Sequence, residues 1–130
     1  MDQRLLKAAQ VAIEQAYAPY SKHQVGAAIL AENGRIYSGC NVENAAYPEG
    51  SCAETGAIAA MINDGAREIR EIAVIGRGAE LCTPCGGCRQ RIREFAAPDA
   101  KVHVCGPEGL RRTFTRDELL PVSFGPEHLP

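Results

Sequence analysis

The sequence predicts an α/β layered domain, because apolar runs typical of strands alternate along the chain with segments typical of helices. Residues 25–30 form a short apolar run without alternation, which suits a strand that is buried on both faces. Residues 4–17 have a helical pattern with one apolar face, whereas residues 53–63 have almost no polar face. We therefore expect the second helix to be buried, and residues 1–130 to form a single domain.

Turn residues and shorter apolar runs define the remaining elements. Pro19 is expected to end the first helix, and Asn33-Gly34 predicts a hairpin turn because this pair tolerates positive φ. Thr115-Arg116-Asp117-Glu118 has the pattern of a capping box that opens one helical turn, which Pro121 is expected to stop. The proline-rich tail is expected to be ordered only by contact with another surface. The other predicted elements are strands at 36–42, 72–75, 101–105 and 113–114, loops at 43–50 and 76–83, and a helix at 85–95.

Composition and charge argue against several classes of protein. The net charge of −2 gives no basic footprint of the kind that binds polymeric nucleic acid. The chain has no run of about 18 apolar residues, so we expect no membrane-spanning helix, and its N-terminus leads into an amphipathic segment rather than a signal peptide. Nothing marks the six cysteines as those of a secreted protein, so we expect reduced thiols and a cytoplasmic location.

Cys52, Glu54, Cys85 and Cys88 have the spacing of a catalytic zinc site. Cys85 and Cys88 form a C-x-x-C clip, whose two sulfurs can reach one metal from the first turn of a helix. Cys52 would be the third ligand, which leaves one coordination position for water. Glu54 is held near that water without being forced to bind the metal, so it can take up and pass on a proton. Zinc deaminases of nucleobases show this arrangement as H-x-E…P-C-x-x-C, with Cys allowed in place of His.

Two other interpretations of these cysteines stay open at this point. A C-x-x-C pair also occurs in redox proteins and in structural zinc sites, and a structural site normally has four ligands. The candidates for a fourth ligand are Cys40, Cys82, Cys105 and His103. The offset of Glu54 favours the catalytic interpretation. So does the predicted position of both cysteine segments at helix N-termini, where free N–H groups and the helix dipole stabilise thiolates.

Three motifs together resemble those of the short, homotetrameric cytidine deaminases. They are Cys52-Ala53-Glu54, the run Pro84-Cys85-Gly86-Gly87-Cys88-Arg89-Gln90, and the run Asn41-Val42-Glu43-Asn44-Ala45-Ala46-Tyr47. The similarity extends from Pro19-Tyr20-Ser21 to Leu119-Leu120-Pro121. It implies a three-layer α/β/α fold with a mixed central sheet of about five strands. It also implies zinc-dependent hydrolysis of cytidine and deoxycytidine to the uridines, as in pyrimidine salvage, by a homotetramer with active sites shared between subunits.

The resemblance also assigns roles to individual residues. It places zinc on Cys52, Cys85 and Cys88 and makes Glu54 the proton shuttle. Asn41 and Glu43 would hold the ribose hydroxyls, because an amide and a carboxylate together donate to and accept from a vicinal diol. Taken alone, these two are only polar residues at a strand end. The backbone around Ser51 and Ala53 would contact the edge of the pyrimidine, and Ala45, Tyr47 and Phe124 would line a neighbouring subunit's pocket.

Two positions depart from the family pattern. Many relatives have Arg directly after the Glu of Cys-Ala-Glu, where this chain has Thr55, and Arg89 is a candidate to supply the missing positive charge. Relatives also have Phe where this chain has His23, which we expect to line the base pocket. These changes leave open a modified cytidine, or a nucleoside antibiotic such as blasticidin S, as the substrate. A polynucleotide-editing deaminase and a zinc module without activity are less well supported, because the chain lacks a basic, aromatic-rich surface and has Glu54.

Overall fold

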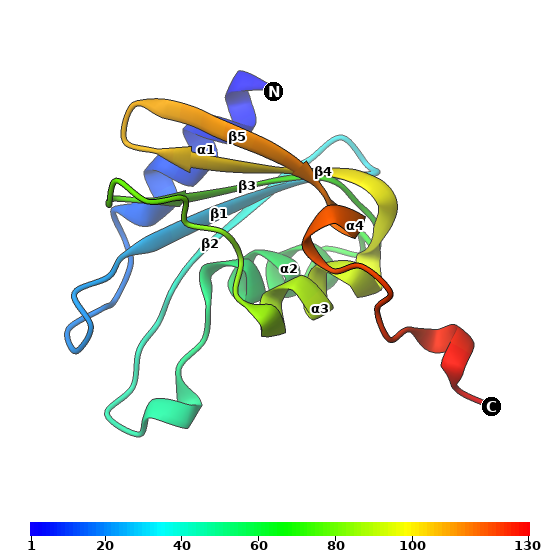
Figure 1. The fold of residues 1–130 in the computed structure, drawn as a ribbon. Helices are drawn as coiled ribbons and strands as arrows, with labels where there is room; N and C mark the ends of the chain where they lie inside the picture. Colours follow the sequence, from blue (N-terminus) through cyan, green and yellow to red (C-terminus); the bar gives the residue numbers. More distant parts are fainter.

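A computed structural model describes residues 1–130 as one five-stranded sheet with helices on both faces (Figure 1). The strand order is β2-β1-β3-β4-β5. β3 and β4 run parallel and every other neighbouring pair is antiparallel, so the sheet is mixed, as the resemblance implied. The strands are β1 (Val25–Ala31), β2 (Ile36–Cys40), β3 (Ile69–Gly76), β4 (Ala96–Gly106) and β5 (Gly109–Thr115).

The helices form the two outer layers (Figure 1). α1 (Gln3–Ile13) packs on one face of the sheet, while α2 (Ala53–Asn63) and α3 (Gly86–Phe95) lie on the other. Alternate residues of β1 belong to different core clusters: Ala27 and Ile29 pack with the α2 side, and Ala28 packs with the α1 side. The prediction of a strand buried on both faces is therefore confirmed, as is the three-layer α/β/α architecture.

The first helix is shorter than predicted. α1 ends at Ile13, six residues before Pro19. The reason is a long-range pairing, because the Tyr17 N–H donates to the Asn41 carbonyl at 2.9 Å and the Tyr17 carbonyl accepts from the Glu43 N–H at 2.9 Å. Tyr17 thus pairs with the segment after β2 in a parallel bridge instead of continuing the helix. The same segment shortens β2, which was predicted to reach residue 42 and ends at Cys40.

α2 is not buried on every side within the single chain. Its inward face is Ala53, Glu54, Ala57, Ile58 and Met61, all of which are buried. Ala59 is exposed, and its neighbours Ala60 and Ile62 are half-buried. The expectation of a fully buried helix was therefore wrong for one chain by itself, because β1, β2 and α3 cover only the inward side of α2.

The C-terminal part combines a confirmed prediction with a correction. α4 (Arg116–Leu119) begins with the predicted capping box, in which Thr115 and Glu118 exchange hydrogen bonds of 3.1 and 3.0 Å. The tail after α4 contains one 3₁₀ turn, η2 (Pro126–His128), and is attached to α3 of its own chain. Arg93 donates to Ser123 at 3.1 Å and to Glu127 at 2.6 Å, so the tail does not depend on another molecule for all its contacts. None of the helices has the length and apolar character needed to cross a membrane.

Candidate active site

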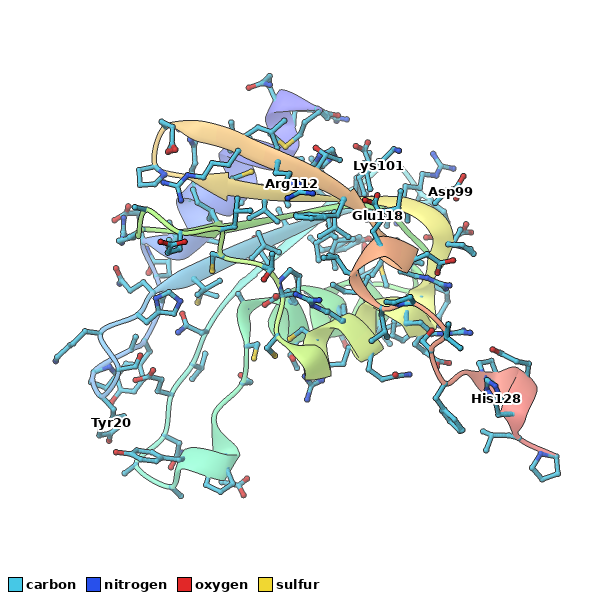
Figure 2. The ribbon with its side chains drawn as sticks, viewed as in Figure 1. Tyr20, Asp99, Lys101, Arg112, Glu118 and His128 are labelled. Carbon is cyan, nitrogen blue, oxygen red and sulfur yellow. The ribbon has the colours of Figure 1, made fainter.

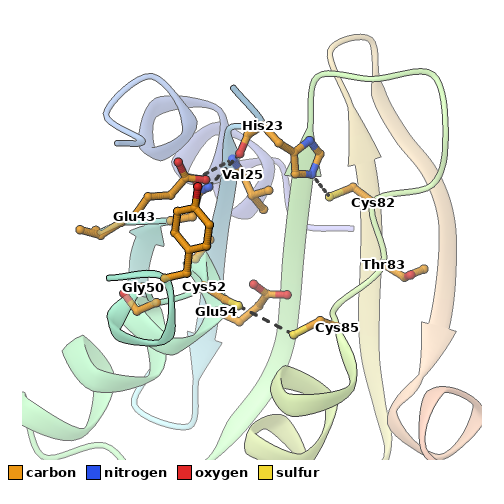
Figure 3. Close-up of a pocket in the computed structure, with 14 residues that line it drawn as sticks. His23, Val25, Glu43, Gly50, Cys52, Glu54, Cys82, Thr83 and Cys85 are labelled. Carbon is orange, nitrogen blue, oxygen red and sulfur yellow. Dashed lines mark hydrogen bonds between the residues drawn. The ribbon is translucent and has the colours of Figure 1, made fainter. Parts of the chain in front are cut away.

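The N-termini of α2 and α3 bring three cysteines together. Cys52 is the N-cap residue of α2, Cys85 is the N-cap residue of α3, and Cys88 lies in the first turn of α3. The three sulfur atoms all lie within 4.8 Å of one another, and those of Cys52 and Cys85 are 3.8 Å apart. All three thiols are free, so no disulfide competes for them. Figure 3 shows Cys52 and Cys85 facing one another across the bottom of a pocket.

The chemistry of these donors fits a zinc ion, because three convergent thiols with no disulfide are the ligand type that Zn²⁺ prefers. No fourth Cys, His, Asp or Glu belongs to the cluster. The structure places the four candidates for a fourth ligand outside this cluster. Cys105 is buried on the α1 side of the sheet, and Cys40 lies at the end of β2. The His103 ring is held by Thr113 at 2.8 Å and Glu71 at 2.7 Å, and Cys82 faces His23. A structural site with four protein ligands is therefore not supported.

The environment of the thiols also indicates a cation. Burial raises the pKa of both Cys52 and Cys88, and Cys88 is fully buried. Burial acts in the same direction on Cys85, but its pKa is lowered overall because the Cys88 N–H and the other two thiols donate to its sulfur. Two of the three sulfurs are therefore hard to ionise without a compensating positive charge, which a bound metal supplies.

Glu54 lies beside the cysteines with only 3% of its surface exposed. Burial raises the pKa of its carboxyl, while its own backbone N–H, the Cys88 thiol and the Arg91 charge act in the opposite direction. A carboxyl with a raised pKa can both accept and release a proton nearer to neutral pH, which is what a proton shuttle requires. Figure 3 shows its carboxyl group directed into the same pocket as the sulfurs of Cys52 and Cys85.

The pocket above this cluster has a volume of about 310 Å³. Besides Cys52, Glu54 and Cys85, the predicted substrate-binding residues that line it are His23, Asn41, Glu43, Ser51 and Ala53. Tyr47, which was predicted for a neighbouring subunit's pocket, lines the pocket of its own chain. Sequence reasoning missed Val25, Val42, Gly50, Cys82 and Thr83, which also line it. The sequence did indicate that Cys82 lies near the site, because Cys82-Thr83-Pro84-Cys85 is a second C-x-x-C pattern that shares Cys85 with the first.

Ala45 and Phe124, the other two residues predicted for a neighbouring subunit's pocket, do not line the pocket of their own chain. Ala45 is exposed in the loop before η1 (Tyr47–Glu49). Phe124 belongs to the tail, where its ring stacks on His128 with ring centroids 5.2 Å apart. Figure 2 shows His128 on the opposite side of the molecule from Tyr20, which lies close to the pocket residue Tyr47. Any contact between Phe124 and a pocket would therefore have to be with that of another subunit.

Asn41 and Glu43 hold the pocket wall together and keep some hydrogen-bonding capacity. The Asn41 amide donates to the His23 carbonyl at 2.8 Å and accepts from the Val25 N–H at 2.9 Å. Glu43 accepts from the Tyr20 and Ser21 N–H groups at 3.0 and 3.1 Å and from the Ser21 hydroxyl, which lowers the pKa of the carboxyl. One amide N–H and one carboxylate lone-pair position stay free for a ligand.

The backbone groups at the start of α2 differ in what they offer a ligand. The Ser51 N–H and carbonyl are both paired with Val42, at 2.9 and 3.0 Å. The Ala53 N–H belongs to the first turn of α2, where N–H groups have no partner within the helix. Ala53 is therefore better placed than Ser51 to donate to the edge of a bound base.

A sequence profile described as the zinc-binding region of cytidine and deoxycytidylate deaminases matches residues 1–104. The chain belongs to this family. The cytidine deaminase of Sporosarcina psychrophila is 42% identical over 127 residues, covering 98% of this chain and 93% of that protein. The crystal structure of the cytidine deaminase from Burkholderia pseudomallei superimposes with a TM-score of 0.89 at 39% identity, covering 95% of this chain and 99% of that one. The blasticidin-S deaminase of Bacillus cereus is 31% identical over 134 residues, covering 95% of this chain and 94% of that protein.

The structure corrects one expectation about this family member. Arg89 was the candidate to offset the charge of the thiolates, but it donates to the Pro84 carbonyl at 2.7 Å and the Leu119 carbonyl at 2.9 Å. It therefore joins α3 to the loop before it and to the end of α4. The guanidinium that faces a sulfur belongs to Arg91 instead, with Nη1 3.6 Å from Cys88 Sγ.

Proposed function

We propose that the chain hydrolyses cytidine and deoxycytidine to uridine and deoxyuridine with release of ammonia. The observation that carries this proposal is the position of Glu54, buried beside three convergent thiols at the bottom of a pocket whose rim has polar side chains suited to a ribose. Family membership and relatives named cytidine deaminases support it. The whole of residues 1–130 would then act as one catalytic domain.

Zinc would be held by Cys52, Cys85 and Cys88, and when bound it makes water available as a nucleophile near neutral pH. Glu54 takes the proton from that water as the oxygen adds to C4 of the cytosine ring. The same carboxyl delivers this proton to N3 and transfers the second proton of the water to the exocyclic amino group. The C4–N4 bond then breaks and ammonia leaves, so one water is consumed for each ammonia released.

The polar rim would select a nucleoside. We propose that the free amide N–H of Asn41 and the free lone-pair position of Glu43 bind the ribose hydroxyls, while His23 packs against the base. An aromatic ring beside a base contributes about 0.5–1.5 kcal/mol beyond the area that it buries, and a neutral imidazole supplies part of this. The Ala53 N–H would bind the pyrimidine edge, with Ser51 shaping the pocket wall beside it.

We also propose that the protein is a homotetramer in which Ala45, Tyr47 and Phe124 contribute to a neighbouring subunit's pocket. Tyr47 is 77% exposed and Phe124 is 56% exposed in the single chain, and Ala59 leaves an apolar side of α2 open. Contact between copies would bury these groups. Light scattering at micromolar concentration tests this assembly, and a stable, fully active monomer would contradict shared sites.

A nucleoside antibiotic of the blasticidin S type is the second candidate substrate. Two observations favour keeping it: the 31% identity to a blasticidin-S deaminase, and His23 at a position where relatives have Phe. The net charge of −2 favours a small nucleoside over polymeric nucleic acid. Deamination of free nucleosides would place the protein in pyrimidine salvage in the cytoplasm.

Ultraviolet absorbance separates these candidates in one experiment. Zinc-loaded protein is incubated separately with cytidine, deoxycytidine, cytosine and blasticidin S, and the initial rates are compared. We expect both nucleosides to be deaminated at much higher kcat/KM than cytosine, because the ribose contacts are absent from the free base. Turnover of blasticidin S with little turnover of cytidine would favour the second candidate, and no turnover of any of them would contradict a deaminase.

A further inference from the structure

Arg91 has an unusual position for a cation on a helix. It lies three residues after Cys88 in α3, and its guanidinium bends back towards the first turn of that helix. Its one hydrogen-bond partner in the chain is the Cys88 sulfur, 3.6 Å from Nη1. Arg93, two residues further on, is instead bound to Ser123 and Glu127 in the tail.

The helix by itself does not favour this position. The N-terminus of a helix carries a partial positive charge, so a cation near the first turn is destabilised there unless an anion lies beside it. Gly87 provides the space, because a Cβ atom at that position would lie only 3.2 Å from Arg91 Nη1. The guanidinium therefore reaches the metal cluster through a gap that a side chain at 87 would narrow.

Three thiolates around Zn²⁺ carry a net charge of −1, which favours a cation nearby. The residue after Glu54 on α2 is Thr55, which is uncharged. Thr55 Oγ1 lies 3.9 Å from Cys88 Sγ, the same sulfur that Arg91 faces from α3. Positions 55 and 91 thus lie against one ligand atom from two different helices.

We propose that Arg91 is a positioning residue that compensates the charge of the three-thiolate zinc centre and holds Cys88 as a ligand. The proposal deepens the proposed function, because it concerns the same zinc site. A point charge is sufficient for this role, because a single guanidinium nitrogen faces the sulfur.

Zinc affinity, measured by competition with a chromophoric chelator, tests this role without depending on activity. Outer partners of metal ligands typically change metal affinity about 10–100-fold when they are removed. We therefore expect Arg91→Met, which keeps the length of the side chain and removes its charge, to bind zinc about 10–100-fold more weakly. Arg91→Lys should stay within about threefold of wild type if charge is what matters. Arg112→Ala, which removes a guanidinium that lies 4.4 Å from the Phe114 ring on β5, is the matched control and should bind zinc like wild type.

The decisive variant is the double substitution Arg91→Met with Thr55→Arg, which moves the positive charge from α3 to α2. We expect it to recover most of the zinc affinity lost in Arg91→Met. Unchanged zinc affinity in Arg91→Met would overturn the proposal, as would equal losses in Arg91→Met and Arg91→Lys. Failure of the double variant to recover affinity, with circular dichroism showing it folded, would also overturn it. The wild-type protein is assayed with cytidine in parallel, so that an absence of deamination counts against the proposed function while the zinc data still decide the role of Arg91.

Discussion

At Gly39 the backbone of β2 packs directly against α2, the helix that carries Glu54. A Cβ atom at position 39 would lie 2.5 Å from the Ala57 nitrogen, 2.6 Å from the Ala53 oxygen and 2.9 Å from the Gly56 carbonyl carbon. All three are backbone atoms of α2, so no side chain can rotate to make room. Substitution of Gly39 by Ala should therefore force the strand and the helix apart.

The size of the effect follows from these distances. Ordinary van der Waals contact begins at about 3.4 Å, so the two backbones must separate locally by about 0.9 Å. Overpacking of a core by one methyl group typically costs about 1–3 kcal/mol of stability. The displaced turn of α2 carries Glu54, and a misplacement of about 1 Å can reduce a catalysed rate about 10²-fold. We predict both effects for Gly39→Ala.

Urea unfolding and cytidine turnover of the zinc-loaded protein measure the two effects. Gly56→Ala is the matched control from the other side of the same contact, because its added Cβ would meet nothing nearer than 3.6 Å. Ala is also favoured over Gly inside a helix by about 1 kcal/mol, so this variant should be at least as stable as wild type. Wild-type stability and turnover in Gly39→Ala, or equal damage from both substitutions, would show that the close approach of β2 to α2 is not what position 39 requires.

Three further predictions concern the site. Single substitutions of Cys40, Cys82 and Cys105 by Ala should leave one zinc per chain by elemental analysis, because none of these thiols joins the cluster; zinc loss from any of them would revise the ligand set. Glu43→Gln should lower kcat/KM for cytidine much more than for free cytosine, because only the nucleoside has ribose hydroxyls for the carboxylate to bind; equal losses would remove the ribose role. His23→Phe should bind cytidine at least as tightly as wild type, so a large rise in KM would place the imidazole in a specific polar contact instead.

The proximity of Cys85 to Cys88 could be predicted from the sequence because it is local. Cys85 and Cys88 are both at the start of one helix, and the chain reaches this arrangement through short-range backbone conformation alone. Glu54 follows from Cys52 for the same reason, since both belong to the beginning of α2. The strand pattern of β1 was similarly visible, because burial on both faces leaves an uninterrupted apolar run.

Features that depend on contacts distant in sequence could not be predicted. α1 ends early because Tyr17 pairs with the segment after β2, and no nearby residue encodes that pairing. The prediction that Arg89 supplies the positive charge beside the thiolates failed for a different reason. A residue adjacent to Cys88 on a helix points to another face, whereas a residue three positions later lies on the same face. Applying the helical period to the predicted helix would have identified Arg91.

The substitution Glu54→Gln decides whether Glu54 transfers protons beside a zinc ion held by three cysteines. Gln is nearly isosteric with Glu and cannot carry the proton, so the fold and the zinc content should be retained. The measurement is kcat for cytidine by ultraviolet absorbance, on protein whose zinc content and circular dichroism match wild type. We predict a loss of at least about 10²–10⁴-fold, the range typical of a general acid–base group. Turnover near the wild-type rate by the zinc-loaded variant would contradict the mechanism.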